Sequence, residues 1–167
     1  MPEKSTIKRA REDKRRGRSA STQAGEFVRE EMHHIREGKH GARSTKQAIA
    51  IGLSKARRAG VDLAPPEKGK TSERSRKSAE HAWEAGQAKG RKPKTSAKRS
   101  RAITKALKRE GKSAASHSAL SRQAHTTANY RTAAERSASA KKAVRTKGHQ
   151  ELSRAAKKAA RTRAAAK

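Results

Sequence analysis

The chain has 167 residues and carries 45 lysines and arginines against 15 acidic residues, a formal net charge of +30. Only 31% of the residues are hydrophobic and 2% are aromatic, which excludes a large apolar core over most of the chain. Cysteine is absent, so disulfides, thiolate zinc sites and cysteine nucleophiles are excluded. We expect no membrane span and no secretory signal, because no apolar run approaches ~20 residues and residues 1–20 lack an apolar segment.

Residues 1–20 are predicted to form a disordered basic arm. Lysines and arginines dominate this stretch, with Glu3, Glu12 and Asp13 between them. Such a terminus is solvated when free and becomes ordered when it contacts a polyanion.

Residues 21–62 are predicted to form a helical hairpin. Apolar residues between 24 and 35 recur at i, i+3 and i+4, which predicts an amphipathic helix that stops at Gly38. Glu31 interrupts this apolar stripe. A hairpin of about 40 residues rarely folds alone, so it needs a third helix, a ligand or a second copy in a homodimer.

The second helix of the hairpin has sequence signals at both ends. Ser44 and Gln47 match a capping box, in which the hydroxyl and the amide side chain each satisfy a free backbone N–H. Gly60 stands where a glycine commonly follows a helix, and Val61 can supply the accompanying apolar contact.

Residues 63–94 are predicted to be a linker that contains proline and glycine, with a short helix at about 72–85. Trp83 lies in this helix and is the only tryptophan. We expect it to anchor the helix against the hairpin in preference to stacking on a base, since stacking sites usually contain several aromatic residues.

Residues 95–167 are predicted to be a basic tail that is disordered or forms isolated helices. Residues 87–167 contain 24 lysines and arginines but only three acids, and few large apolar residues. Residues 135–148 and 151–164 repeat each other at an offset of 16. Two such units are too few to pack as a solenoid, so we interpret them as repeated phosphate-binding modules.

One helix within this tail is predicted from its charge pattern. Lys98, Arg101, Lys105 and Lys108 fall on one helical face, and Gly111 ends the segment. A solvated helix face normally alternates its charges, whereas this face is almost entirely positive. The fold class predicted for the whole chain is therefore mostly α: a small hairpin, with two or three helices, followed by a long Ala/Lys/Arg-rich tail.

The stretch KQAIAIGLSKAR at residues 46–57, together with FVREEMHHIREGKHG at residues 27–41, resembles an uncharacterised bacterial family of small basic proteins. The resemblance covers residues 25–62 approximately and implies a bacterial source and a compact helical unit, without any chemistry. The region from residue 98 onward is similar in composition to lysine- and alanine-rich histone-like tails, which condense DNA.

The histidines are the residues in this sequence that a metal site would use. His33, His34 and His40 lie close in sequence, and His34 could share a helix face with Glu30 and Glu37. No H-E-x-x-H motif or second ligand cluster accompanies them, so we expect no metal and no cofactor. Glycine-rich phosphate loops and the G-x-S-x-G motif are absent, so we expect no catalytic residues and no enzyme activity.

Taken together, the sequence predicts non-sequence-specific binding and compaction of nucleic acid, with DNA preferred over RNA, in the nucleoid of the cytoplasm. No small-molecule substrate and no membrane partner are expected. The alternative is an RNA- or ribosome-associated protein, and a third hypothesis is a cationic protein of membrane surfaces. The predicted phosphate ligands are Lys8, Arg9, Arg15, Arg16, Lys98, Arg99, Arg101, Lys105, Lys108, Arg109, Lys141, Lys142, Arg145, Lys157, Lys158, Arg161 and Arg163.

Overall fold

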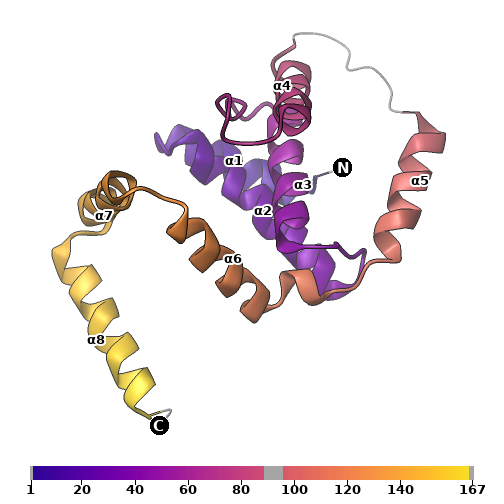
Figure 1. Cartoon of the computed structure of the whole chain (residues 1–167). Coiled ribbons are helices and arrows are strands. Elements are labelled where there is room, and N and C mark those ends of the chain that lie inside the picture. Colours follow the sequence, from indigo (N-terminus) through magenta and orange to yellow (C-terminus); the bar gives the residue numbers. More distant parts are fainter. Residues whose placement is uncertain (1, 89–95, 166–167) are drawn as a thin grey trace. The chain divides into compact units, whose positions relative to one another are not determined.

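The structure, a computed structural model, describes residues 2–88 and 96–165. Within these ranges the chain forms eight α-helices and one 3-10 turn (Figure 1). The chain divides into two compact units, residues 1–123 and 124–167, which are described separately. The helices are α1 (Lys4–Arg15), α2 (Ala20–Glu37), α3 (Thr45–Arg58), α4 (Glu73–Gln87), α5 (Ala97–Lys108), η1 (Ser113–Ala115), α6 (His117–Asn129), α7 (Ala133–Lys147) and α8 (His149–Ala165).

The predicted fold class, a short hairpin with a disordered tail or isolated helices, is wrong. Residues 4–15, expected in a disordered arm, form α1 and pack against α2. Residues 113–115, expected in the tail, pack against α2 and α3. The prediction failed because it counted large apolar residues, whereas much of this core is alanine. Part of the predicted linker, residues 89–94, lies outside the described residues.

Two apolar clusters form the core of residues 1–123, one at each end of the α2–α3 pair. Met32 and Ile35 of α2 pack with Ala48 of α3 in the first cluster. Phe27 of α2 packs with Ala56 of α3 in the second cluster, to which α1 also contributes. The apolar stripe of α2 thus faces α3 along its length, as its i, i+3, i+4 spacing predicts.

Helices α2 and α3 approach closely where α3 carries a glycine. A Cβ atom at Gly52 would lie 2.7 Å from the Cα atom of Val28 on α2. Because real Cβ contacts are longer than this, any larger residue at position 52 would push the two helices apart. Glycine therefore sets the spacing of the hairpin.

Both ends of α3 use the signals that the sequence predicts. The Ser44 hydroxyl accepts a hydrogen bond from the Gln47 N–H at 3.2 Å. The Gln47 side chain reaches back to the N–H of Arg43, one residue earlier than the expected partner. At the other end Gly60 has a φ of 93°, and the N–H of Val61 donates to the Ala56 carbonyl at 3.1 Å. This is the Schellman arrangement, and the Val61 side chain is buried as expected.

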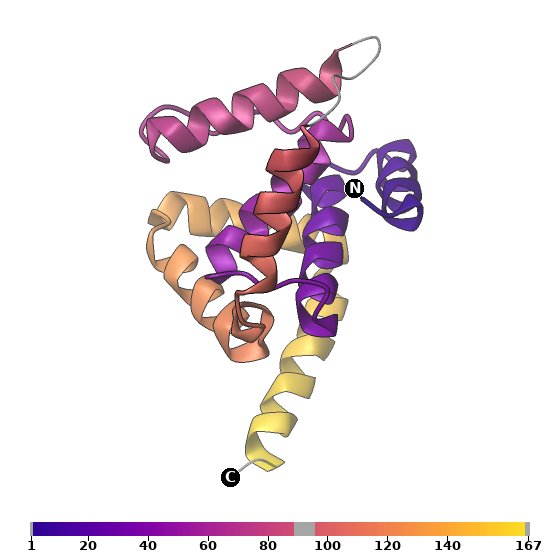
Figure 2. The same ribbon diagram turned by 90° about the vertical axis from the view of Figure 1, so that its right-hand side faces the viewer.

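Helix α4 crosses α3 at the end where Arg57 lies (Figure 2). Ala82 is fully buried in this contact, and a Cβ atom at Gly86 would lie 1.8 Å from the Arg57 carbonyl oxygen. Trp83, the expected core anchor, is only half-buried, and its indole N–H donates to Asp62 at 2.9 Å. Small residues therefore allow the close contact between α3 and α4, and Trp83 adds a hydrogen bond to Asp62.

The internal repeat corresponds to the last two helices. Residues 135–148 lie in α7 and the glycine after it, and residues 151–164 lie in α8. Thr132 and Glu135 form a complete capping box at the start of α7. High alanine content favours helix here even though no residue of α7 or α8 is buried.

Candidate nucleic-acid interface

Helix α5 presents a strongly basic face. The Ser96 hydroxyl caps its first turn by accepting from the Arg99 N–H. One side of the helix forms a shallow groove of about 470 Å³, lined by Ser100, Arg101, Thr104, Lys105, Lys108 and Arg109. Four of these six residues are cations, and α5 contains no acidic residue. The groove can therefore hold an anion such as a phosphate.

The end of α5 is held by the loop that joins α2 to α3. The N–H of Gly41 donates to the Leu107 carbonyl at 2.9 Å, and the N–H of Ala42 donates to the Gly111 carbonyl at 3.2 Å. A Cβ atom at Gly41 would lie 1.9 Å from the Glu110 carbonyl oxygen, so the two backbones meet without room for a side chain. No local signal in the sequence predicts this contact.

The turn η1 continues this attachment. Ala114 and Ala115 are buried in the first apolar cluster. The Thr45 hydroxyl donates to the Ala114 carbonyl at 2.7 Å, and Arg36 Nε donates to the Ala115 carbonyl at 2.9 Å. The hairpin therefore positions the C-terminal end of the basic helix. Adjacent alanines recur in the C-terminal region, so this pair does not single out the attachment in the sequence.

The predicted phosphate ligands of α7 and α8 are exposed. Equivalent cations of the repeat occupy equivalent places in the two helices: Lys141, Lys142 and Arg145 in α7, and Lys157, Lys158 and Arg161 in α8. Arg163 is exposed as well. Of the two acids in these helices, Glu135 is engaged in the capping box. The surfaces of α7 and α8 are therefore cationic, because few acidic residues on these helices can neutralise the charge.

The predicted ligands at the N-terminus lie on a helix and not on an arm. Lys8, Arg9 and Arg15 are exposed on α1, and Arg16, which follows the helix, is exposed as well. Arg9 forms an ion pair with Glu26 of α2, and Arg16 forms one with Glu12. Two of these four cations are therefore already matched by carboxylates.

The acids of α2 are directed into the molecule or toward cations. Glu30 is 4% exposed and Glu31 is fully buried. Lys55 of α3 lies between them, with Nζ 4.0 Å from Glu30 Oε1 and in a short ion pair with Glu31 Oε2. Glu31, which breaks the apolar stripe in the sequence, is thus compensated by a lysine from the facing helix.

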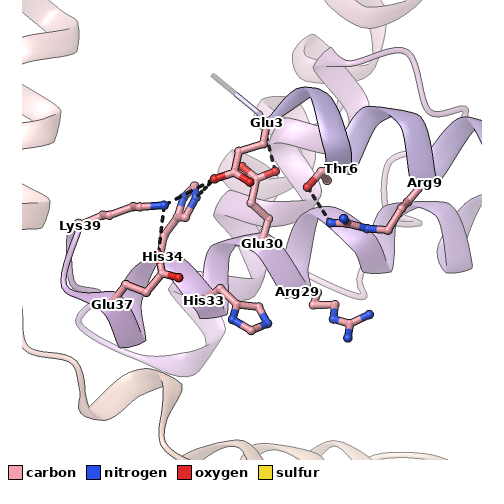
Figure 3. A pocket seen from close by; sticks show the side chains of 9 residues that line it. All are labelled: Glu3, Thr6, Arg9, Arg29, Glu30, His33, His34, Glu37 and Lys39. Carbon is pink, nitrogen blue, oxygen red and sulfur yellow. Dashed lines mark hydrogen bonds and ion pairs between the residues drawn. The ribbon is translucent and has the colours of Figure 1, made fainter.

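A second polar cavity, of about 410 Å³, lies between the start of α1 and the end of α2 (Figure 3). The Glu3 carboxylate lies 2.9 Å from His34 Nε2 and 3.5 Å from Lys39 Nζ. Hydrogen bonds from His34 and then Lys39 hold the pKa of Glu3 below its usual range. The Glu3 N–H also donates to Glu30, so this network joins the two helices.

The histidines form a different cluster from the one considered in the sequence. Side-chain ligand atoms of Glu31, His34 and His40 lie within 4.8 Å of one another. Glu30, which was expected to share a face with His34, accepts from the Glu3 backbone, and Glu37 pairs with Lys39 at 3.0 Å. The rings of His34 and His40 stand edge to face, 6.1 Å apart.

A family model described as a family of unknown function (DUF6496) matches residues 19–68, which span α2, α3 and the loop that follows. The match agrees with the predicted resemblance in its location and in the absence of a known activity. No curated protein and no solved structure gives a significant match to the chain. Over the described residues, each helix is too short or too polar to cross a membrane.

Proposed function

We propose that this chain binds nucleic acid without sequence preference, by neutralising phosphates with the exposed cations of α5, α7 and α8. Duplex DNA is the preferred ligand, and a bacterial, nucleoid-associated role in compaction is part of the proposal. The observation that supports it is the segregation of charge along the chain. Acids are engaged within the N-terminal helices, while cations without compensating acids occupy the C-terminal ones.

The two parts of the chain differ in how their charges are used. In α1–α4, carboxylates such as Glu26, Glu31 and Glu73 pair with basic residues of the same unit. In residues 87–167, only three acids accompany 24 lysines and arginines. Of these acids, Glu110 pairs with Arg43 and Glu135 caps α7. When so strongly positive a surface contacts nucleic acid, its cations displace many of the counterions that are condensed on the phosphates.

The basic face of α5 has a length that suits a phosphate backbone. Arg101 and Lys108 are seven residues apart, which corresponds to about 10 Å along a helix. A DNA strand carries one phosphate per ~3.4 Å of axis, so this face spans roughly three phosphates. Flexible lysine and arginine side chains can reach them without a fixed docking geometry.

The preference for duplex over single-stranded nucleic acid rests on the aromatic residues. Proteins that bind single strands stack bases on exposed aromatic rings. Phe27 is buried, and the Trp83 indole is hydrogen-bonded to Asp62. Among the described residues this leaves Tyr130, which is 83% exposed, as the aromatic ring available to stack on a base. One ring does not make a stacking platform.

The test compares two variants of equal charge. In the first, Arg101, Lys105 and Lys108 of α5 are changed to Gln together with Arg109, the residue that follows the helix. In the matched control, four exposed cations outside α5, α7 and α8 are changed to Gln: Lys14, Lys46, Arg74 and Lys77. Fluorescence anisotropy with a random-sequence duplex, and with a structured RNA of equal length, measures binding at fixed salt.

We expect the α5 variant to lose at least tenfold in affinity for the duplex. The change in the logarithm of the affinity should be less than half as large in the control variant. Equal losses in both variants would show that net charge alone governs binding and would contradict the assignment to α5. A strong preference for the RNA would instead favour an RNA-associated role.

A further inference from the structure

We propose that Glu31, His34 and His40 bind a divalent transition-metal ion of the zinc type. Glu31 and His34 stand three residues apart on α2, so their side chains share one helix face. The helix ends before Gly38, and the following loop brings His40 back beside this face. One ligand atom from each side chain lies within 4.8 Å of the other two.

The buried carboxylates of Glu30 and Glu31 each have one oxygen, Oε1, without a hydrogen-bond partner. In Glu31, Oε2 is engaged by Lys55, whereas Oε1 has no hydrogen-bond partner although the side chain is fully buried. Burying a charged oxygen without a partner is costly, so such an atom calls for a partner, which can be water or an ion. Nε2 of His40 lies only 3.2 Å from Glu31 Oε1.

The second nitrogen of each histidine ring is held as in known metal sites. Nδ1 of His40 donates to the Gly41 carbonyl at 3.1 Å, and Nε2 of His34 donates to the Glu3 carboxylate at 2.9 Å. Histidines that ligate metals usually donate their other N–H to a carbonyl or carboxylate in this manner. In neutral rings these bonds leave His40 Nε2 and His34 Nδ1 as lone-pair donors.

A cation between His40 and Glu31 resolves an otherwise unfavourable contact. When His40 is neutral and donates through Nδ1, its Nε2 lone pair faces the lone pairs of Glu31 Oε1. The buried carboxylates of Glu30 and Glu31 also share a single ammonium group, Lys55. A metal ion between His40 Nε2 and Glu31 Oε1 would accept both lone pairs.

Two imidazoles and one carboxylate form the ligand set that zinc and similar ions prefer, whereas magnesium and calcium favour oxygen ligands. Tetrahedral bonds of ~2.1 Å place ligand atoms about 3.4 Å apart. The distance of 3.2 Å between His40 and Glu31 already meets this requirement. The His34 ligand atom lies within 4.8 Å of the other two, so it would move closer when the ion binds, and water would fill the fourth position.

Metal binding to the full-length chain tests the proposal directly. The chelator-treated protein is titrated with Zn²⁺ by calorimetry at neutral pH, and with Co²⁺ by visible absorption. We expect one saturable site with micromolar or tighter affinity, and the intense Co²⁺ bands of a four-coordinate site. His34→Ala and His40→Ala should each weaken binding by at least tenfold, and Glu3→Ala should weaken it by about tenfold through the loss of its bond to His34.

His33→Ala is the matched control, because His33 is an exposed neighbour on α2 outside the cluster. Circular dichroism of each variant verifies that it folds. If a histidine variant does not fold, Glu31→Gln takes its place, because it removes the charge of a ligand and preserves the shape of the side chain. If all of the histidine variants bind the metal ion equally well, the binding is adventitious and the proposal is wrong. Absence of binding, with His40 found protonated by NMR near pH 7, would overturn it in favour of an ion pair.

Discussion

At the scale of single residues, burial separates the charges that form ion pairs inside the fold from those that face solvent. Glu31 is fully buried opposite Lys55, whereas Lys46, nine residues earlier on the same helix as that lysine, is exposed. The sequence indicated that Glu31 interrupts an apolar stripe but could not show what compensates it, because its partner is 24 residues away in the chain.

Replacing Lys55 by Met leaves the Glu31 charge buried without its partner. Loss of one member of a buried pair is strongly destabilising. Because the Lys55 side chain is 24% exposed, we expect a smaller loss, about 2–3 kcal/mol in the free energy of unfolding. Urea denaturation in the presence of a chelator measures this value. Lys46→Met is the control and should change stability by less than about 0.5 kcal/mol; similar losses in both variants would contradict the role of Lys55.

Glu73 and Arg76 provide a test by pH. Arg76 donates to both carboxylate oxygens, at 2.8 Å from Nη2 and 3.0 Å from Nε, and lowers the pKa of Glu73 below its ordinary value of 4.5. The pair therefore stabilises α4 fully above pH 4.5, and this contribution is lost as the pH falls through the lowered pKa.

A titration of the Glu73 carboxyl followed by NMR measures that pKa. In the native chain it should lie below 4.5, and Arg76→Gln should return it toward 4.5. A pKa that is the same in both proteins would show that the ion pair is not formed in solution.

At the scale of elements, the sequence was most informative where a local signal decides the structure. The hydroxyl of Ser44 and the glycine at position 60 predicted both ends of α3, since caps depend on neighbouring residues. Helix α1 was missed, because its buried positions are Thr6 and Ala10, which do not produce an apolar stripe. Its stability comes from packing against α2, a contact that local sequence does not show.

Two glycine substitutions test the packing of the hairpin. Gly25 lies inside α2 with open space around its Cβ position, so Gly25→Ala should stabilise the protein by about 0.5–1 kcal/mol. Gly52→Ala would place its Cβ 2.7 Å from Val28 Cα and should destabilise it by about 1–3 kcal/mol. Chemical denaturation compares the two; a stabilising effect of both would mean that the helices are not in close contact.

At the scale of the whole chain, composition predicted the charge but not the architecture. A net charge of +30 favours a polyanionic partner whatever the fold. The attachment of residues 107–115 to the α2–α3 loop was not predictable, because it joins segments about 70 residues apart through backbone groups and alanines. The candidate phosphate ligands remain a prediction; the structure adds that all of them are exposed and that two pair with acids.

The charge segregation also predicts how binding is distributed. If many cations each neutralise one phosphate, single substitutions on α7 or α8 should weaken binding by small and similar factors. Lys142→Gln and Lys158→Gln, at equivalent positions of the repeat, should each lower duplex affinity by less than about threefold, and the double variant should combine their effects. Anisotropy titrations measure these factors. Abolition of binding by either single change would indicate a defined site instead.

The salt dependence of binding shows how many phosphates the chain neutralises. The full-length chain is titrated onto a random-sequence duplex, and onto a structured RNA of matched length, from about 50 to 400 mM salt. The account predicts that the logarithm of the duplex affinity falls linearly with the logarithm of salt concentration, with a slope steeper than about −5, as expected for more than five neutralised phosphates. A slope shallower than about −2, or RNA binding that exceeds duplex binding and persists at high salt, would contradict it.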